Sequence, residues 1–187
     1  GIHRGGLKAG EYCAIIGAGP IGLLAGMIAQ AYGAHAILLD LVQERLDFAR
    51  ELGIEYVINS REENPVERVS EITGGTMAQQ VMECSGANVA VLQTLDLVSH
   101  AGRITLTGWP PKETPIPTDV ITRKEIDIRG ARTSAGEFEE AIELIYTKKV
   151  DVAKILTKTI GLEEAPETIR DIEKNPGNYM KVVVKMD

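Results

Sequence analysis

The stretch that most constrains this chain runs from Tyr12 to Gly22, where a short apolar segment leads into a glycine-rich turn. Gly17, Gly19 and Gly22 fit the pattern G-x-G-x-x-G, which lets a backbone approach a pyrophosphate closely. The pattern is weak alone, since glycines at this spacing also occur in ordinary tight turns. Its context supports it, because an alanine- and leucine-rich helix is predicted after the turn and a second strand after that helix. The sequence therefore predicts a strand, a nucleotide-binding turn, a helix and a strand in succession.

The second predicted strand ends in an acid, Asp40, which lies eighteen residues after Gly22. An acid about 20 residues beyond such a turn binds the ribose in dinucleotide-binding folds. Its carboxylate would accept hydrogen bonds from both adenosine ribose hydroxyls and would repel a 2′-phosphate, and the next residue, Leu41, cannot neutralise one. The sequence thus favours NAD over NADP, with a solvated loop acid as the alternative. Arg45 could flank the same ribose, although a helix arginine is usually a solvated side chain.

Predicted strands alternate with predicted helices over most of the chain. Strands are expected at residues 12–16, 36–39, 56–58, 81–84, 103–107 and 126–129, and helices at about 20–32, 42–52, 66–72 and 89–98. The proline-rich residues 110–119 are predicted to form a surface loop. Because parallel strands need crossover helices between them, we predict a doubly wound α/β fold with a parallel six-stranded sheet in the order 3-2-1-4-5-6.

The pattern changes after the sixth predicted strand. A helix at 137–147, a short strand near residue 155, a helix at 164–173 and a final strand at 181–185 are expected there. We therefore divide the chain into a Rossmann-type domain, residues 1–135, and a C-terminal extension of helices and strand, residues 136–187.

Two further turns follow strands four and five, at the sheet edge where ligands of open α/β sheets bind. They are Ser85-Gly86 and Thr107-Gly108. Gly108 lets a backbone come close to a ligand. Trp109 could pack on a ligand ring or could cover the core of the domain itself.

Charge and composition narrow the possible partners. A net charge of -7 and a pI near 5.1 argue against nucleic acid, because phosphate backbones select basic faces. No segment approaches the roughly 18 apolar residues that span a bilayer, and no signal-peptide pattern opens the chain. We therefore expect no membrane partner and a cytoplasmic location. The chain begins at Gly1 without a methionine, which we interpret as a piece of a longer protein.

The cysteines and histidines give no catalytic or metal site. Cys13 and Cys84 both fall in predicted buried strands, which favours free thiols over a disulfide. Cys84 could pass for a nucleophile, but its apolar strand and the lack of a nearby histidine favour a buried thiol. The three histidines have no metal-ligand spacing among themselves or with the cysteines, and we expect them to be exposed.

Several nucleotide-binding classes share a glycine turn. A short-chain dehydrogenase would need a Tyr-x-x-x-Lys pair to move a proton at the substrate hydroxyl. The residues four positions after the five tyrosines are Ile16, Ala36, Ser60, Val150 and Val183, which excludes that class. A methyltransferase would also use an acid after strand two, but a six-stranded parallel sheet suits a dinucleotide better. A flavoprotein remains compatible with the turn.

A series of separated motifs resembles the zinc-dependent medium-chain alcohol dehydrogenase family, within its branch of sorbitol, threonine and other polyol dehydrogenases. In chain order the motifs are residues 3–10, residues 17–23, Asp40 with Arg45-Leu46, residues 83–86, the Gly108 turn and residues 124–130. The resemblance implies that the adenosine ribose and the nicotinamide bind at the motifs described above. The predicted cofactor-binding residues are Gly17, Gly19, Pro20, Ile21, Gly22, Asp40, Arg45, Cys84, Ser85, Gly86, Thr107, Gly108, Trp109, Ala131, Arg132 and Thr133.

In such enzymes a catalytic zinc polarises the substrate alcohol, and a hydride passes to the nicotinamide. The zinc ligands, the structural-zinc cysteine cluster and the proton relay of the family lie in an N-terminal domain, and this chain has neither a four-cysteine cluster nor a Gly-His-Glu motif. The resemblance therefore implies the NAD-binding part of an enzyme that oxidises a secondary alcohol of a polyol, sugar acid or hydroxy amino acid. Zinc would belong to the full-length enzyme only, and no catalytic or metal-binding residue is predicted in this chain, which alone should be inactive.

The resemblance also implies an assembly. The final predicted strand would return to the missing catalytic domain, and the sheet edge at residues 126–129 would pair two copies in a homo-dimer or homo-tetramer. The alternative is a catalytically silent nucleotide-binding or dimerisation module.

Overall fold

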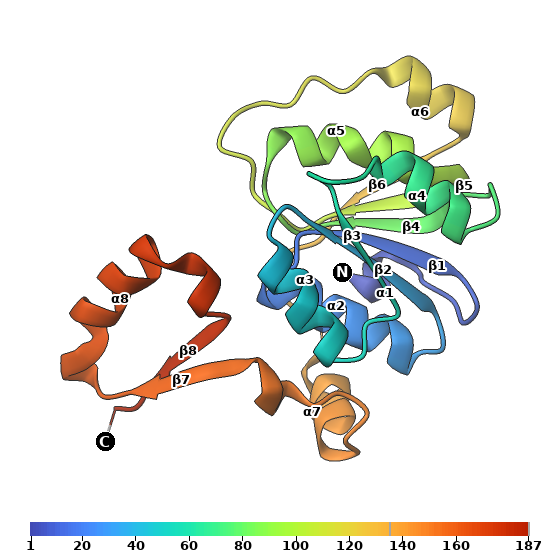
Figure 1. Cartoon of the computed structure of the whole chain (residues 1–187). Coiled ribbons are helices and arrows are strands. Elements are labelled where there is room, and N and C mark those ends of the chain that lie inside the picture. The colour runs from blue at the N-terminus through green and yellow to red at the C-terminus, as the bar shows by residue number, and fades with distance from the viewer. Residues whose placement is uncertain (135, 187) are drawn as a thin grey trace.

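The computed structural model describes residues 1–134 and 136–186, so the predicted domain boundary at residue 135 and the last residue lie outside the described part. Six parallel strands form one sheet in the order β3-β2-β1-β4-β5-β6 (Figure 1), which confirms the predicted topology. The strands are β1 Tyr12–Ile16, β2 His35–Asp40, β3 Tyr56–Asn59, β4 Ala78–Glu83, β5 Val98–Leu106 and β6 Asp127–Gly130. The accompanying helices are α1 Ile2–Gly5, α2 Pro20–Ala31, α3 Gln43–Glu51, α4 Pro65–Ile72, α5 Asn88–Leu97 and α6 Thr118–Lys124.

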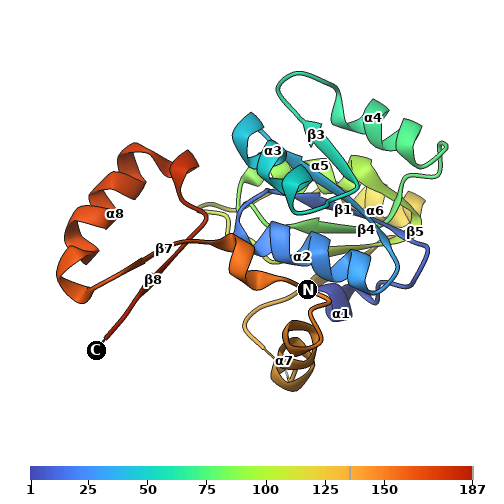
Figure 2. The same cartoon turned by 60° about the horizontal axis from the view of Figure 1, so that its bottom comes forward.

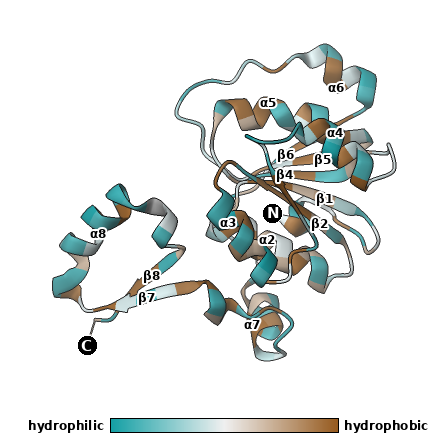
Figure 3. Ribbon diagram, viewed as in Figure 1, coloured by the Kyte–Doolittle hydropathy of each residue, from teal (hydrophilic) through white to brown (hydrophobic). Residues whose placement is uncertain are grey.

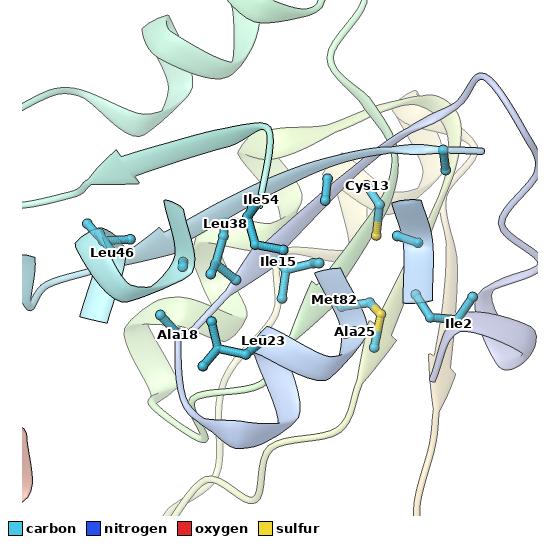
Figure 4. Packing of buried hydrophobic residues seen from close by; sticks show 14 of the residues in the cluster. Ile2, Cys13, Ile15, Ala18, Leu23, Ala25, Leu38, Leu46, Ile54 and Met82 are labelled. Carbon is cyan, nitrogen blue, oxygen red and sulfur yellow. The ribbon is translucent and has the colours of Figure 1, made fainter. Parts of the chain in front are cut away.

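The sheet is buried on both faces, as a parallel sheet covered by crossover helices must be. On one face Ile15 of β1 packs with Leu23 of α2 and Leu46 of α3 (Figure 4). On the other face Ile16 packs with Val69 of α4 and residues of α5. Successive residues of β1 thus enter opposite cores, which is why this strand is apolar without alternation.

The C-terminal part of the chain stays in contact with the six-stranded part, because Glu140 pairs with His3 at 3.1 Å and Ile155 belongs to the same core cluster as Ile15. The C-terminal part contains α7 Phe138–Tyr146, β7 Leu156–Ile160, α8 Ala165–Lys174 and β8 Lys181–Val184. Strands β7 and β8 pair in parallel as their own two-stranded sheet, and with α8 they project to one side of the large sheet (Figures 1 and 2). Helix α8 is largely hydrophilic on the side seen in Figure 3. Three apolar side chains of this region are nevertheless exposed: Ile169 on α8, Leu162 before α8 and Met186 after β8.

Several predicted boundaries were wrong. Strand β4 begins at Ala78 rather than at residue 81. Strand β5 begins at Val98, immediately after α5, rather than at residue 103, because residues 100–102 continue the strand with Ala101 at a φ of 52° instead of forming a turn. Residues 118–119, predicted as loop, begin α6. This helix has no buried residue among its seven, so it lacks the apolar periodicity that reveals a helix. The short strand expected near residue 155 begins one residue later, at Leu156.

In the described part of the chain, no helix combines the length and the apolar character that crossing a membrane requires.

Candidate cofactor site

The glycine turn between β1 and α2 is set by close backbone packing. Gly17 has a φ of 110°, which side chains rarely adopt, and a β-carbon there would lie 3.1 Å from the amide nitrogen of Ser85. A β-carbon on Gly22 would overlap the carbonyl oxygen of Gly17. Two of the three motif glycines are therefore required by the fold itself.

Gly19 is different, because a β-carbon on it would have no described heavy atom within 4 Å. It is the N-cap of α2, in extended conformation and without a side-chain cap, and Pro20 follows as the first helical residue. The N–H groups of the first turn of α2 have no partner within the helix. Open space beside these groups, at the positive end of a twelve-residue helix, fits a pyrophosphate.

Asp40 is the last residue of β2 and lies beside this turn. Its carboxylate accepts hydrogen bonds from the backbone around it. Its Oδ2 accepts a hydrogen bond from the Ala18 N–H at 2.6 Å, and its Oδ1 accepts from the N–H groups of Leu41 and Val42 at 2.8 and 2.9 Å. The side chain is only 9% exposed, so Asp40 is not a solvated loop acid. With three backbone donors already bound, the carboxylate has less capacity for two ribose hydroxyls than the sequence led us to expect.

Arg45 lies next to Asp40 and is largely covered. Its Nη1 is 4.0 Å from Oδ2 of Asp40, its side chain is 29% exposed, and its Nε is buried without a hydrogen-bond partner among the described residues. The pair therefore sits together at the carboxyl end of β2, as predicted.

An open cavity of about 870 Å³ lies beyond the carboxyl ends of β5 and β6. Predicted residues from three separate segments line it, namely Ile21, Thr107, Gly108, Trp109, Ala131, Arg132 and Thr133. The sheet order explains this, because β5 and β6 are neighbours whose carboxyl ends open at the same edge. The structure thus brings the residues predicted for the nicotinamide into one wall.

Trp109 is 72% exposed, so it does not cover the core of its own domain. The guanidinium carbon of Arg132 lies 4.2 Å from the centre of the indole ring, a cation–π contact at the cavity mouth. Arg132 supplies the only charged side chain among the described residues that line this cavity. The free face of the indole is available to a ligand ring.

The two cysteines are free thiols. Burial raises the pKa of the Cys84 thiol to about 11, although the hydrogen bond from the Thr107 hydroxyl, at 3.2 Å, works against this shift. Burial also raises the pKa of the Cys13 thiol. A protonated thiol is a poor nucleophile at neutral pH, which argues against covalent chemistry at Cys84, and Cys84 does not line the cavity.

Glu83 lies in the motif at residues 83–86, but sequence reasoning gave it no role in the site. It is fully buried at the end of β4, and its Oε1 accepts hydrogen bonds from the Ser85 N–H, the Ser85 hydroxyl and the Gly86 N–H at 2.7, 2.5 and 2.9 Å. Its backbone carbonyl accepts from the N–H groups of Thr107 and Gly108, both at 3.0 Å, and from the Thr107 hydroxyl at 2.6 Å. An acid that ends an apolar strand immediately before a Ser-Gly turn was the available signal.

None of the three histidines lines the cavity beyond β5 and β6, but His3 lines an adjoining pocket that shares Ile21 and Thr107 with it. His3 and His100 are exposed, but His35 is half-buried, contrary to expectation, because its ring stacks on Tyr12 with ring centres 4.9 Å apart. Within residues 1–134 and 136–186, no three His, Cys, Asp or Glu side chains gather in a way that could hold a metal ion.

The glycine turn, the acid after β2 and the cavity beyond β5 and β6 define a nicotinamide-dinucleotide-binding domain of the Rossmann type. The chain belongs to the zinc-binding dehydrogenase family, whose sequence model matches residues 20–147. This confirms the resemblance drawn from the motifs.

Among curated proteins, the chain is 51% identical over 181 residues to an uncharacterized zinc-type alcohol dehydrogenase-like protein of Haemophilus influenzae, covering 97% of this chain and 53% of that protein. It is 30% identical to D-xylulose reductase of Saccharomyces cerevisiae, covering 96% of this chain and 52% of that protein. The chain thus spans about half the length of the curated relatives it matches.

Solved structures give the same picture. The alcohol dehydrogenase TADH from Thermus sp. ATN1 superposes with a TM-score of 0.90 at 30% identity, covering 98% of this chain and 54% of that one. A zinc-binding dehydrogenase from Sinorhizobium meliloti 1021, solved bound to NADP, superposes with a TM-score of 0.89 at 26% identity, covering 99% of this chain and 55% of that one.

Proposed function

We propose that this chain is the NAD-binding part of a dehydrogenase that oxidises a secondary alcohol of a polyol, sugar acid or hydroxy amino acid. The observation that carries the proposal is the open space at Gly19, which lies at the bare N-terminus of α2 and beside Asp40. Membership of the zinc-binding dehydrogenase family supports an oxidoreductase role, and the similarity to D-xylulose reductase supports a polyol-type substrate.

The choice of NAD over NADP rests on Asp40. Its buried carboxylate would meet a 2′-phosphate with like charge, and the neighbouring Arg45 is already directed at that carboxylate. One remaining acceptor site on Asp40 would hold a ribose hydroxyl. The relative from Sinorhizobium meliloti was solved with NADP, so both cofactors belong in any test.

The residues of this chain would bind and orient the cofactor. The first turn of α2 would hold the pyrophosphate, and the exposed side chains of Ile21 and Trp109 would shield the nicotinamide from water. When bound, the nicotinamide ring accepts a hydride from the substrate alcohol. The described residues offer no group of metal ligands, and we infer that the zinc and the proton relay belong to the other half of the enzyme.

The division of the chain follows from the same proposal. Residues 1–135 would form the cofactor domain, and residues 136–187 would lead back to the catalytic half, against which the exposed Leu162, Ile169 and Met186 would pack. We expect no alcohol oxidation by the chain alone, and zinc-dependent turnover by the purified chain would contradict this. Strand β6, at the edge of the sheet, is our predicted contact in a homo-oligomer. A monomer in light scattering would count against that contact.

The cofactor proposal predicts that the purified chain binds NADH about tenfold or more tightly than NADPH, because a like charge at the 2′ position costs about 1.4 kcal/mol or more. Isothermal calorimetry with both nucleotides measures the two affinities directly. An absence of NADH binding, or a preference for NADPH, would defeat the cofactor claim.

A further inference from the structure

We propose that Glu83 is a positioning residue that holds two cofactor-facing turns, residues 85–86 and residues 107–109, in place against each other. The inference rests on the proposed cofactor function, and it extends that function to a buried side chain that does not line the cavity. Glu83 would act on the nicotinamide end of the cofactor through the backbone of these turns.

The first support is the hydrogen bonding of Oε1. This one atom accepts three hydrogen bonds, from the N–H groups of Ser85 and Gly86 and from the Ser85 hydroxyl. Hydrogen bonds to a carboxylate are stronger than those between neutral groups. Without the carboxylate, the N–H groups of Ser85 and Gly86 would lose the acceptor that they share. The shape of residues 85–86 therefore depends on a side chain that precedes them in β4.

The second support is the position of Oε2. This atom is buried and has no hydrogen-bond partner among the described residues. A β-carbon built on Gly108 would overlap Oε2 and would also lie against the amide nitrogen of Gly86. The carboxylate is thus enclosed between the two turns, and Gly108 has no side chain because that space is filled.

The third support is the direct contact between the turns. Gly86 has a φ of 75°, and a β-carbon on it would lie 3.2 Å from both the backbone nitrogen and the backbone oxygen of Trp109. A displacement of residues 85–86 therefore reaches Trp109, which lines the cavity. The Glu83 carbonyl, bonded to the N–H groups of Thr107 and Gly108, fixes the base of the same wall.

A buried oxygen without a hydrogen-bond partner costs free energy. Here the cost is located between two turns that end at the proposed nicotinamide cavity. A purely structural role of Glu83 predicts only a loss of folding stability. A positioning role predicts, in addition, weaker binding that is confined to the nicotinamide end of the cofactor.

The test compares two ligands by calorimetry on the full chain. NADH carries the nicotinamide, whereas ADP carries only the adenosine and the pyrophosphate. Glu83→Ala should weaken NADH binding about tenfold and ADP binding less than about twofold, because the turn that these hydrogen bonds hold packs against Trp109 of the nicotinamide cavity. Glu83→Gln keeps the volume and one acceptor oxygen but loses the charge, and should weaken NADH about threefold.

Two more variants make the test independent of folding losses. Gly108→Ala keeps the Glu83 side chain, but its added β-carbon would overlap Oε2 of Glu83 and force the turns apart, so it should weaken NADH binding about tenfold and leave ADP binding unchanged. Gln80→Met is the matched control. Gln80 is also fully buried in β4, and its side-chain oxygen also has no hydrogen-bond partner among the described residues. Unlike Glu83, it lies away from the two turns. This variant should alter the melting temperature while both affinities stay within about twofold.

Equal weakening of NADH and ADP by the Glu83 variants would overturn the inference, as would unchanged NADH affinity in Glu83→Gln and Gly108→Ala. The same NADH loss in Gln80→Met would also overturn it. Failure of the unsubstituted chain to bind NADH is a different result, because it overturns the proposed function itself and this inference with it.

Discussion

Replacing Gly19 by threonine should abolish detectable NADH binding while leaving the protein folded. Gly19 already has extended backbone angles, with φ of −77° and ψ of −178°, which a β-branched residue adopts readily. A β-carbon there would contact no described heavy atom within 4 Å. Threonine is about as good an N-cap as glycine, so the melting temperature should change by no more than about 3 °C.

The loss of binding has a steric cause. The added methyl and hydroxyl groups would occupy the space beside the first turn of α2, where the pyrophosphate is proposed to lie. We expect the NADH affinity to fall about a hundredfold or more, since the anion could no longer approach the helix N-terminus. Circular dichroism melting and calorimetry measure the two quantities separately.

Gly22→Ala provides the contrast, because its β-carbon would overlap the carbonyl oxygen of Gly17. This variant should lose several kcal/mol of stability, of the order that backbone strain and overpacking cost. If Gly19→Thr binds NADH as tightly as the unsubstituted chain, the pyrophosphate does not lie at this turn.

Asp40→Asn should reduce the preference for NADH over NADPH by about tenfold or more, because the substitution removes the negative charge that would face a 2′-phosphate. It should also lower the melting temperature. An asparagine can present only one oxygen to the N–H groups of Ala18, Leu41 and Val42, which Asp40 binds with two. The ratio of the two affinities, measured by calorimetry well below the melting temperature, separates the two effects.

Asp47→Asn is the control for charge. Asp47 lies on α3, is 55% exposed and pairs with Arg50 at 2.7 Å, so its substitution removes the same charge without touching the turn. Both affinities should stay within about twofold of the unsubstituted values, since an exposed ion pair contributes little. An unchanged ratio in Asp40→Asn would remove this residue from the ribose site.

The large sheet could be predicted because its strands carry their own signals. Residues 12–16 were predicted as a strand from an apolar run closed by a glycine, and β1 has these bounds. The order of the strands followed from the alternation with helices. Strand β5 and helix α6 were harder, because the start of β5 crosses a glycine-containing segment and α6 has no fully buried side chain.

The sequence predicted where several candidate residues lie in the fold, but it did not predict their hydrogen bonds. The spacing from the glycine turn identified Asp40 correctly as the acid after β2, but it gave no sign that Ala18, twenty-two residues earlier, would bind the same carboxylate. The role of Glu83 was missed for a related reason. This role depends on Thr107 and Gly108, which reach Glu83 only because β4 and β5 are neighbours in the sheet.

The exposed indole at the cavity mouth has an optical consequence. Trp109 is the single tryptophan of the chain, so the whole indole emission comes from one point on the wall of the proposed nicotinamide cavity. Reduced nicotinamide absorbs in the wavelength range where indole emits, whereas adenine does not. Trp109 is therefore an intrinsic energy-transfer donor, whose emission would be quenched by a bound reduced nicotinamide. The absorption of the adenosine end of the dinucleotide would not affect this emission.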